Sequence, residues 1–109
     1  MVIVRYLTPE GVDVFEQWFR SIRDNVAKTA IRRRLDRLAA GNPGSHRYLR
    51  DGVAELRVDH GPGYRVYYAQ SGDMIILLLC GGDKGSQEKD IDRAIAYWKQ
   101  WKERNGRQR

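Results

Sequence analysis

The sequence has 109 residues, of which 41% are hydrophobic, and its formal net charge is +6. These values exclude a disordered tail and predict one small domain spanning residues 1–109, with a modest hydrophobic core. No apolar run approaches the ~18 residues of a membrane-spanning helix, and the positive charge favours a polyanionic partner such as nucleic acid or an acidic protein.

The start of the chain and its cysteine content predict the compartment. The opening MVIVRYLTPE lacks the charged and long apolar segments of a signal peptide. Cys80 is the single cysteine, so the chain cannot form an internal disulfide. Both features favour a reducing cytoplasm.

The first half of the sequence predicts one strand and two helices. Residues 2–7 (VIVRYL) are typical of a strand. Thr8-Pro9 predicts the start of a helix over residues 9–23, because threonine caps helices and proline is favoured at the first helical position. Asp24-Asn25 can end that helix and cap a second one, which stops near Gly41. The two helices have apolar residues at helical spacing: Val12, Phe15, Phe19 and Ile22 in the first, and Ala27, Ile31, Leu35 and Leu38 in the second.

The second half predicts a loop over residues 41–52, three antiparallel strands with tight turns, and a final helix. The strands are residues 53–59, 64–70 and 74–80, and the last is apolar on both faces, so we expect it to be central and covered on both sides. Residues 81–86 predict a loop, and the helix runs from Gln87 to about Glu103. The order β-α-α-β-β-β-α predicts an α+β fold, with an antiparallel sheet packed against a helical hairpin.

Strand alternation places several polar side chains on one face of this sheet. If the apolar sets pack on the helical hairpin, the opposite face is open and carries four candidate residues: Glu55, Arg57, Arg65 and Tyr67. Two interpretations remain open. Glu55 can form a cross-strand salt bridge with Arg57 or Arg65, worth ~0.2–1 kcal/mol. Alternatively, the cluster is a concave phosphate site in which the Arg65 guanidinium acts as a planar fork.

The segment GGDKGSQ (81–87) brings Lys84 to the same end of the sheet. Its glycines allow a backbone nest, and Ser86 can cap a helix whose N-terminus attracts anions. The spacing is not that of a P-loop, and a plain strand-to-helix connection is the alternative.

Other basic residues form a second, weaker set. KTAIRRRLDR (28–37) puts cations on the second helix, as a track for RNA phosphates or as a solvated face. The candidate RNA-binding residues are Arg32, Arg33 and Arg37, with Arg34 beside them, and Arg47 and Arg50 in the following loop. His46 and His60 are expected to be exposed in loops without further ligands at metal spacing, so we expect no metal site. Cys80 has no identifiable base partner and is expected to be a buried strand residue.

The strings ELRVDHGPGYRVYY and LLLCGGDKGSQEKDIDRA together resemble the RelE/ParE superfamily of type II toxins, most closely the HigB-related "addiction module killer protein" group. The resemblance is densest from Gly52 to Ala94. It implies a ribosome-associated mRNA endonuclease that needs no metal or cofactor, and a cognate antitoxin that usually binds operator DNA. Arg57, Arg65 and Lys84 match the basic active-site positions of the superfamily. The first of two lysines in RelE is replaced by Glu55, and Tyr67 could substitute for the missing tyrosine near the last helix.

The implied mechanism is attack of a ribose 2′-OH on the adjacent phosphate. Arg65, with Arg57, would stabilise the transition state, and Lys84 would stabilise charge or donate a proton. Glu55 could act as the base or hold Arg57 in position, and these acid–base assignments remain open. A rival hypothesis is a ParE-like, non-enzymatic inhibitor of DNA gyrase, in which these residues are structural or face the antitoxin. A third is a nucleic-acid-binding domain without toxicity.

Overall fold

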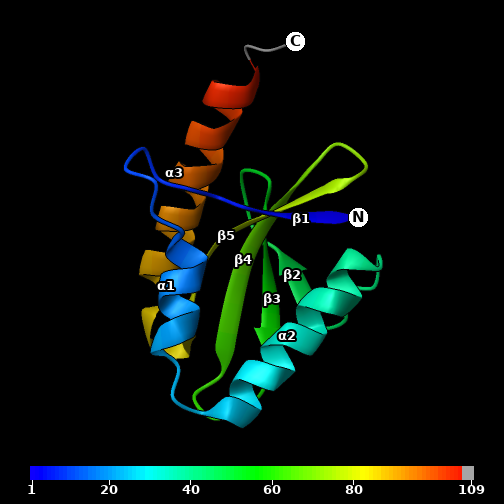
Figure 1. Ribbon diagram of the computed structural model, residues 1–109, viewed down its shortest axis with the longest axis vertical. Helices are drawn as coiled ribbons and strands as arrows, with labels where there is room; N and C mark the ends of the chain where they lie inside the picture. The colour runs from blue at the N-terminus through cyan, green and yellow to red at the C-terminus, as the bar shows by residue number, and fades with distance from the viewer. Residues whose placement is uncertain (107–109) are drawn as a thin grey trace.

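A five-stranded mixed sheet lies between a pair of helices and a long C-terminal helix in the computed structural model, which describes residues 1–106 (Figure 1). Residues 107–109, which the single-domain prediction includes, lie outside the described part. The elements in chain order are β1 (Val2–Arg5), α1 (Val14–Ser21), α2 (Asn25–Ala39), β2 (His46–Tyr48), β3 (Val53–Val58), β4 (Tyr64–Ser71), β5 (Ile75–Asp83), the 3-10 turn η1 (Lys84–Ser86) and α3 (Gln87–Gly106).

The strand order in the sheet is β1-β5-β4-β3-β2. The predicted antiparallel sheet is wrong at one edge, because β1 pairs with β5 in parallel and makes the sheet mixed; the other neighbours are antiparallel. The predicted hairpins from β3 to β4 and from β4 to β5 are confirmed, as is the α+β class. β5 is buried from Ile76 to Gly82, as expected for a strand covered on both faces.

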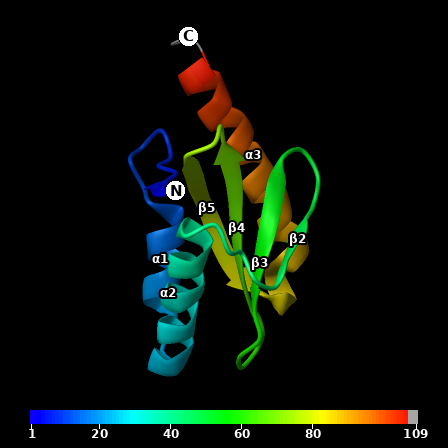
Figure 2. The same ribbon diagram turned by 90° about the vertical axis from the view of Figure 1, so that its right-hand side faces the viewer.

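The helices divide the hydrophobic core into two layers (Figure 2). On one face, Phe19 of α1 and Ile31 of α2 pack in one cluster with Leu56 of β3, as predicted. On the other face, Trp98 of α3 packs in a second cluster that includes Leu77 and Tyr67. Both faces of the sheet therefore contribute to the core, and α3 covers the face that was expected to be open.

The first helix begins later than predicted. Thr8 does not cap it; the Thr8 hydroxyl accepts a hydrogen bond from the Val12 backbone N–H at 3.0 Å and closes a separate turn. Gly11 lies in that turn at a φ of 83°, a left-handed conformation that a continuous helix excludes. Asp13 is the actual N-cap of α1, and its carboxylate accepts from the Glu16 N–H at 2.9 Å. The predicted cap of α2, Asp24, is confirmed.

Four further features differ from the prediction. The segment 41–52, predicted as a loop, contains the short edge strand β2, which pairs with β3. Residues 81–83, also predicted as loop, continue β5. Asp83, rather than Ser86, caps the turn that follows, and α3 extends to Gly106 rather than ending near Glu103.

The two glycines in β5 are needed for close packing against both helical layers. A Cβ atom on Gly81 would lie 2.2 Å from Trp18 Cε3, and one on Gly82 would lie 1.8 Å from Asp90 Oδ2. The Asp90 carboxylate is itself held by the Ser86 hydroxyl at 2.5 Å and by Arg93 at 2.9 Å. Gly82 thus allows the first turns of α3 to approach the sheet.

We expect Gly82→Ala to lower the free energy of unfolding by about 2 kcal/mol, because the added methyl group would displace the held Asp90 carboxylate. Gly106→Ala is the control, since a Cβ there has no neighbour within 4 Å among the described residues. Urea denaturation would measure both, and equal midpoints for the two variants would contradict the role given to Gly82.

Candidate functional site

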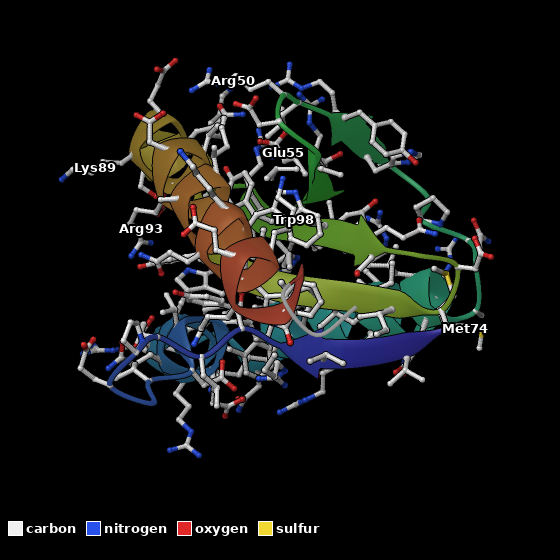
Figure 3. The ribbon with its side chains drawn as sticks, turned by 90° about the horizontal axis from the view of Figure 1, so that it is seen from above. Arg50, Glu55, Met74, Lys89, Arg93 and Trp98 are labelled. Atoms are coloured by element: carbon white, nitrogen blue, oxygen red, sulfur yellow. The ribbon has the colours of Figure 1, made fainter. Side chains whose placement is uncertain are left out.

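The Glu55 carboxylate is fully buried and lies at the centre of a polar cluster between β3 and α3 (Figure 3). The Arg57 Nε donates to Glu55 Oε1 at 3.1 Å, and the Gln87 amide donates to Oε2 at 2.8 Å. The Arg65 Nε lies 3.8 Å from Oε2, and Arg47 Nη2 lies 3.8 Å from Oε1. Arginines from β2, β3 and β4 therefore converge on one carboxylate.

Strand register produces this convergence. Arg57 lies directly opposite Arg65 in the β3–β4 pair, and Arg47 lies opposite Glu55 in the β2–β3 pair. Like charges opposite one another repel, and a buried carboxylate is costly unless it is paired. The Glu55 carboxylate lies among the arginines, so its negative charge reduces their mutual repulsion. The arginines in turn reduce the cost of burying the carboxylate. The predicted salt bridge from Glu55 to the arginines is confirmed, but it is buried rather than on the surface.

The predicted open face is wrong at Glu55 and Tyr67, because α3 covers both. Tyr67 is fully buried, and its hydroxyl has no hydrogen-bond partner within residues 1–106. Burial first, and then the neighbouring Glu55 charge, raise the pKa of the Tyr67 phenol far above its usual value. Neither side chain can contact a macromolecular substrate in this structure.

Arg65 and Lys84 meet at an open pocket of about 350 Å³, as the sequence predicted for their end of the sheet. The turn of residues 59–63 forms the rest of its lining. Arg65 is only 8% exposed, and its Nε lacks a hydrogen-bond partner within the described chain, whereas Lys84 is exposed. Gly63 lies against both: a Cβ built on it would be 3.8 Å from Arg65 Nη1 and 3.9 Å from Lys84 Cβ. A fixed guanidinium and a movable ammonium in one pocket suit an anionic group.

The structure does not bring the other predicted RNA-binding arginines to this pocket. Arg32, Arg33 and Arg37 are exposed on α2, which packs on the opposite face of the sheet. Arg50 pairs with Asp92 of α3 at 2.9 Å. Arg47 alone lies near the cluster, through its contact with Glu55.

Arg34 has a structural role, because it binds backbone carbonyls, and the basic pattern of α2 does not indicate this role. Its guanidinium donates to the carbonyls of Pro43 and Ser45, both at 2.8 Å, and also to the carbonyl of Arg57. These bonds hold the segment before β2 against β3. Burial lowers the pKa of Arg34, in keeping with this inward position.

His60 is a pocket residue that no local sequence pattern indicates. It lies in the predicted loop between β3 and β4, where its side chain is 35% exposed and lines the same pocket as Arg65, and its Nε2 lies 2.8 Å from Asp24 Oδ2. The hydrogen bond from His60 is the largest cause lowering the pKa of Asp24. The two residues are 36 positions apart, so no local pattern links them.

The described residues contain no candidate metal-binding group, no membrane-spanning helix and no reactive thiol. Residues 1–106 contain no group of three or more His, Cys, Asp or Glu side chains that could hold a metal ion. No helix in this range is long and apolar enough to cross a membrane. Cys80 is buried, and burial raises the pKa of its thiol to about 12, which makes it a poor nucleophile.

Comparison with known proteins places the chain in a family with an uncharacterized protein of Haemophilus influenzae. The two are 44% identical over 80 residues, which cover 73% of this chain and 81% of the relative. This chain therefore belongs to the same family as that protein. No protein-family model matches the sequence.

We expect Glu55→Gln to lower the free energy of unfolding by about 3 kcal/mol, because it leaves opposed arginines without their buried counter-charge. The matched control is Asp92→Asn, which removes the acid of an Arg50 pair whose side chains are 65% and 71% exposed. Asp92→Asn should lower the free energy of unfolding by at most about 1 kcal/mol.

Chemical denaturation would measure both losses. Added phosphate should restore part of the stability of Glu55→Gln, beyond the effect of sodium chloride at equal ionic strength, because an anion can bind the freed arginines. A loss no larger than that of Asp92→Asn would contradict the central position of Glu55.

Proposed function

We propose that this protein is the toxin of a type II toxin–antitoxin system of the RelE/ParE superfamily, and that it cuts mRNA on the ribosome without a metal ion. The observation that carries the proposal is the pocket in which the buried Arg65 and the exposed Lys84 meet beside the 59–63 turn. The order of helices and strands, with a sheet between a helix pair and a C-terminal helix, is compatible with a RelE-like fold.

Arg65 is suited to stabilise the transition state of phosphodiester cleavage. When a 2′-OH attacks the adjacent phosphate, negative charge builds on the equatorial oxygens, and a guanidinium can donate two parallel hydrogen bonds to them. The Arg65 side chain is held by burial and by the Glu55 charge. A preorganised cation of this kind needs no rearrangement during the reaction.

Lys84 is exposed, in contrast to the buried Arg65. Its side chain is exposed at the start of η1, so it can follow the phosphate and either stabilise charge or protonate the leaving 5′-oxygen. Arg57, 36% exposed and bound to Glu55, adds positive potential from the neighbouring strand. In this proposal Glu55 holds the arginines and does not act as a base.

The exposed arginines of α2 fit a partner surface rather than the reaction. Arg32, Arg33 and Arg37 are exposed on α2 and are not among the residues that line the pocket, and they can attract ribosomal RNA or an acidic antitoxin. Such binding should weaken steeply with salt. We assign the cleavage reaction to the pocket, and the attraction of ribosomal RNA or of an acidic antitoxin to α2. The proposed partners are the ribosome, mRNA and a cognate antitoxin, all in the cytoplasm.

We expect Lys84→Ala and Arg65→Lys to reduce cleavage about 100-fold, because each removes a donor to the transition-state charge. Arg65→Lys keeps a cation beside Glu55 and so limits the damage to folding. The control is Lys89→Ala, an exposed lysine of α3 whose side chain points away from the sheet in Figure 3.

The measurement is the mapping of mRNA 5′ ends after induction of each variant in bacteria. Cuts at fixed codon positions that persist in Lys89→Ala and fade in the two pocket variants support the proposal. Intact mRNA together with loss of gyrase supercoiling would instead favour a ParE-like inhibitor. Undiminished cutting by both pocket variants would remove Arg65 and Lys84 from the mechanism.

A further inference from the structure

We propose that His60 is the general base of this site and that Asp24 positions it. The inference rests on the proposed nuclease function and deepens it, because Arg65 and Lys84 leave the deprotonation of the 2′-OH without an assigned group. In this role the imidazole of His60 accepts the 2′-OH proton through Nδ1 while Nε2 stays bonded to Asp24.

The first support is location. His60 belongs to the 59–63 turn and lines the same pocket as Arg65 and Lys84. The turn contains Gly61 and Gly63 at φ angles of 56° and 79°, left-handed conformations that fold it tightly between β3 and β4. The imidazole is therefore held at the edge of the phosphate site by a short hairpin connection.

The second support is orientation. His60 Nε2 lies 2.8 Å from Asp24 Oδ2, while Asp24 Oδ1 accepts the backbone N–H groups of Val26 at 2.9 Å and Ala27 at 3.2 Å. Asp24 is the N-cap of α2, so its carboxylate is fixed by the start of a helix that packs on the sheet. One carboxylate thus caps a helix and orients an imidazole from a distant turn.

The chemistry of that pair selects the tautomer. The hydrogen bond from His60, followed by those from the helix backbone, lowers the pKa of Asp24, so its carboxylate is ionised and can only accept. Nε2 must then carry the hydrogen, and in the neutral ring Nδ1 carries the lone pair. A carboxylate that fixes the tautomer of a histidine base is a general catalytic arrangement.

The cationic and buried groups near the pocket are poorer bases. Arg65 stays protonated and Lys84 is the proton donor of the proposed reaction. Glu55 and Tyr67 are fully buried. Asp59 is the one carboxylate among the residues that line the pocket, so Asp59→Asn tests the alternative base. The charged groups around His60 are Asp24 from α2, Asp59 from its own turn, Arg65 from β4 and Lys84 from η1.

The step balances without any co-reactant. The 2′-oxygen forms a bond to phosphorus as its proton passes to His60 Nδ1, and the bond from phosphorus to the 5′-oxygen breaks. The Lys84 ammonium gives a proton to that leaving oxygen. The products are a 2′,3′-cyclic phosphate and a 5′-hydroxyl, and proton exchange with water restores both side chains.

The test is the single-turnover rate of cleavage of mRNA on programmed ribosomes, measured with the purified full chain across a range of pH. We expect His60→Ala to lower the rate about 100-fold and to remove the acid limb of the pH profile. Asp24→Asn should lower the rate about 10-fold while keeping the helix cap, because asparagine is as good an N-cap as aspartate. His46→Gln, which changes a residue outside the pocket lining, should cut at the wild-type rate.

Nitrogen NMR of the imidazoles separates a positioning role from a structural one. The chain has two histidines, so His46→Gln leaves one set of ring signals. Wild-type His60 should show the Nε2–H tautomer, and Asp24→Asn should lose that preference while its urea midpoint stays unchanged.

The outcomes distinguish this inference from the proposed function. If wild type cuts and His60→Ala cuts equally with the same pH profile, His60 is not the base and the nuclease proposal stands. If Asp59→Asn loses activity while His60→Ala keeps it, the base is Asp59. If wild type leaves mRNA intact on the ribosome, both proposals fail.

Discussion

The burial of the Glu55 carboxylate is the constraint on which the polar side of this fold depends. The register of β3 and β4 places Arg57 opposite Arg65, and Arg65 is buried. A carboxylate with no exposed area and bonds to Arg57 and Gln87 offsets that repulsion. Because Gln87 is the first residue of α3, the same carboxylate also attaches the helix to the sheet.

The burial of Glu55 determines how the Arg65 guanidinium is oriented. One side of its guanidinium faces the interior through Nε, and a terminal nitrogen lies close to the 59–63 turn. Arg65 is thereby a core residue and a pocket residue at once, unlike the exposed arginines of α2. The pocket combines this rigid cation with the movable Lys84 and with a histidine that is oriented from the helical layer by Asp24. Groups from both layers of the structure therefore meet at one end of the sheet.

The faces of β3 and β4 could be predicted from sequence because a strand alternates with period 2 and short turns fix the register. That is why Glu55, Arg57, Arg65 and Lys84 were placed at one end of the sheet. Solvent access was not predictable, since it depends on α3 packing across the strands. Gly81 and Gly82 were interpreted as loop residues, whereas they permit close approach of Trp18 and Asp90 within β5. The pairing of Asp24 with His60 joins residues 36 apart, and only the tertiary structure brings them together.

We propose that this protein holds an RNA phosphate in the pocket of Arg65 and Lys84. The most direct measurement is an NMR titration of the isotope-labelled chain with a trinucleotide that carries a 2′-deoxyribose and so cannot be cleaved. We expect the largest shifts at the Arg65 side-chain Nε–H, at Gly63 and at Lys84. Shifts confined to Arg32, Arg33 and Arg37 on α2, with the pocket signals unchanged at saturating ligand, would contradict it.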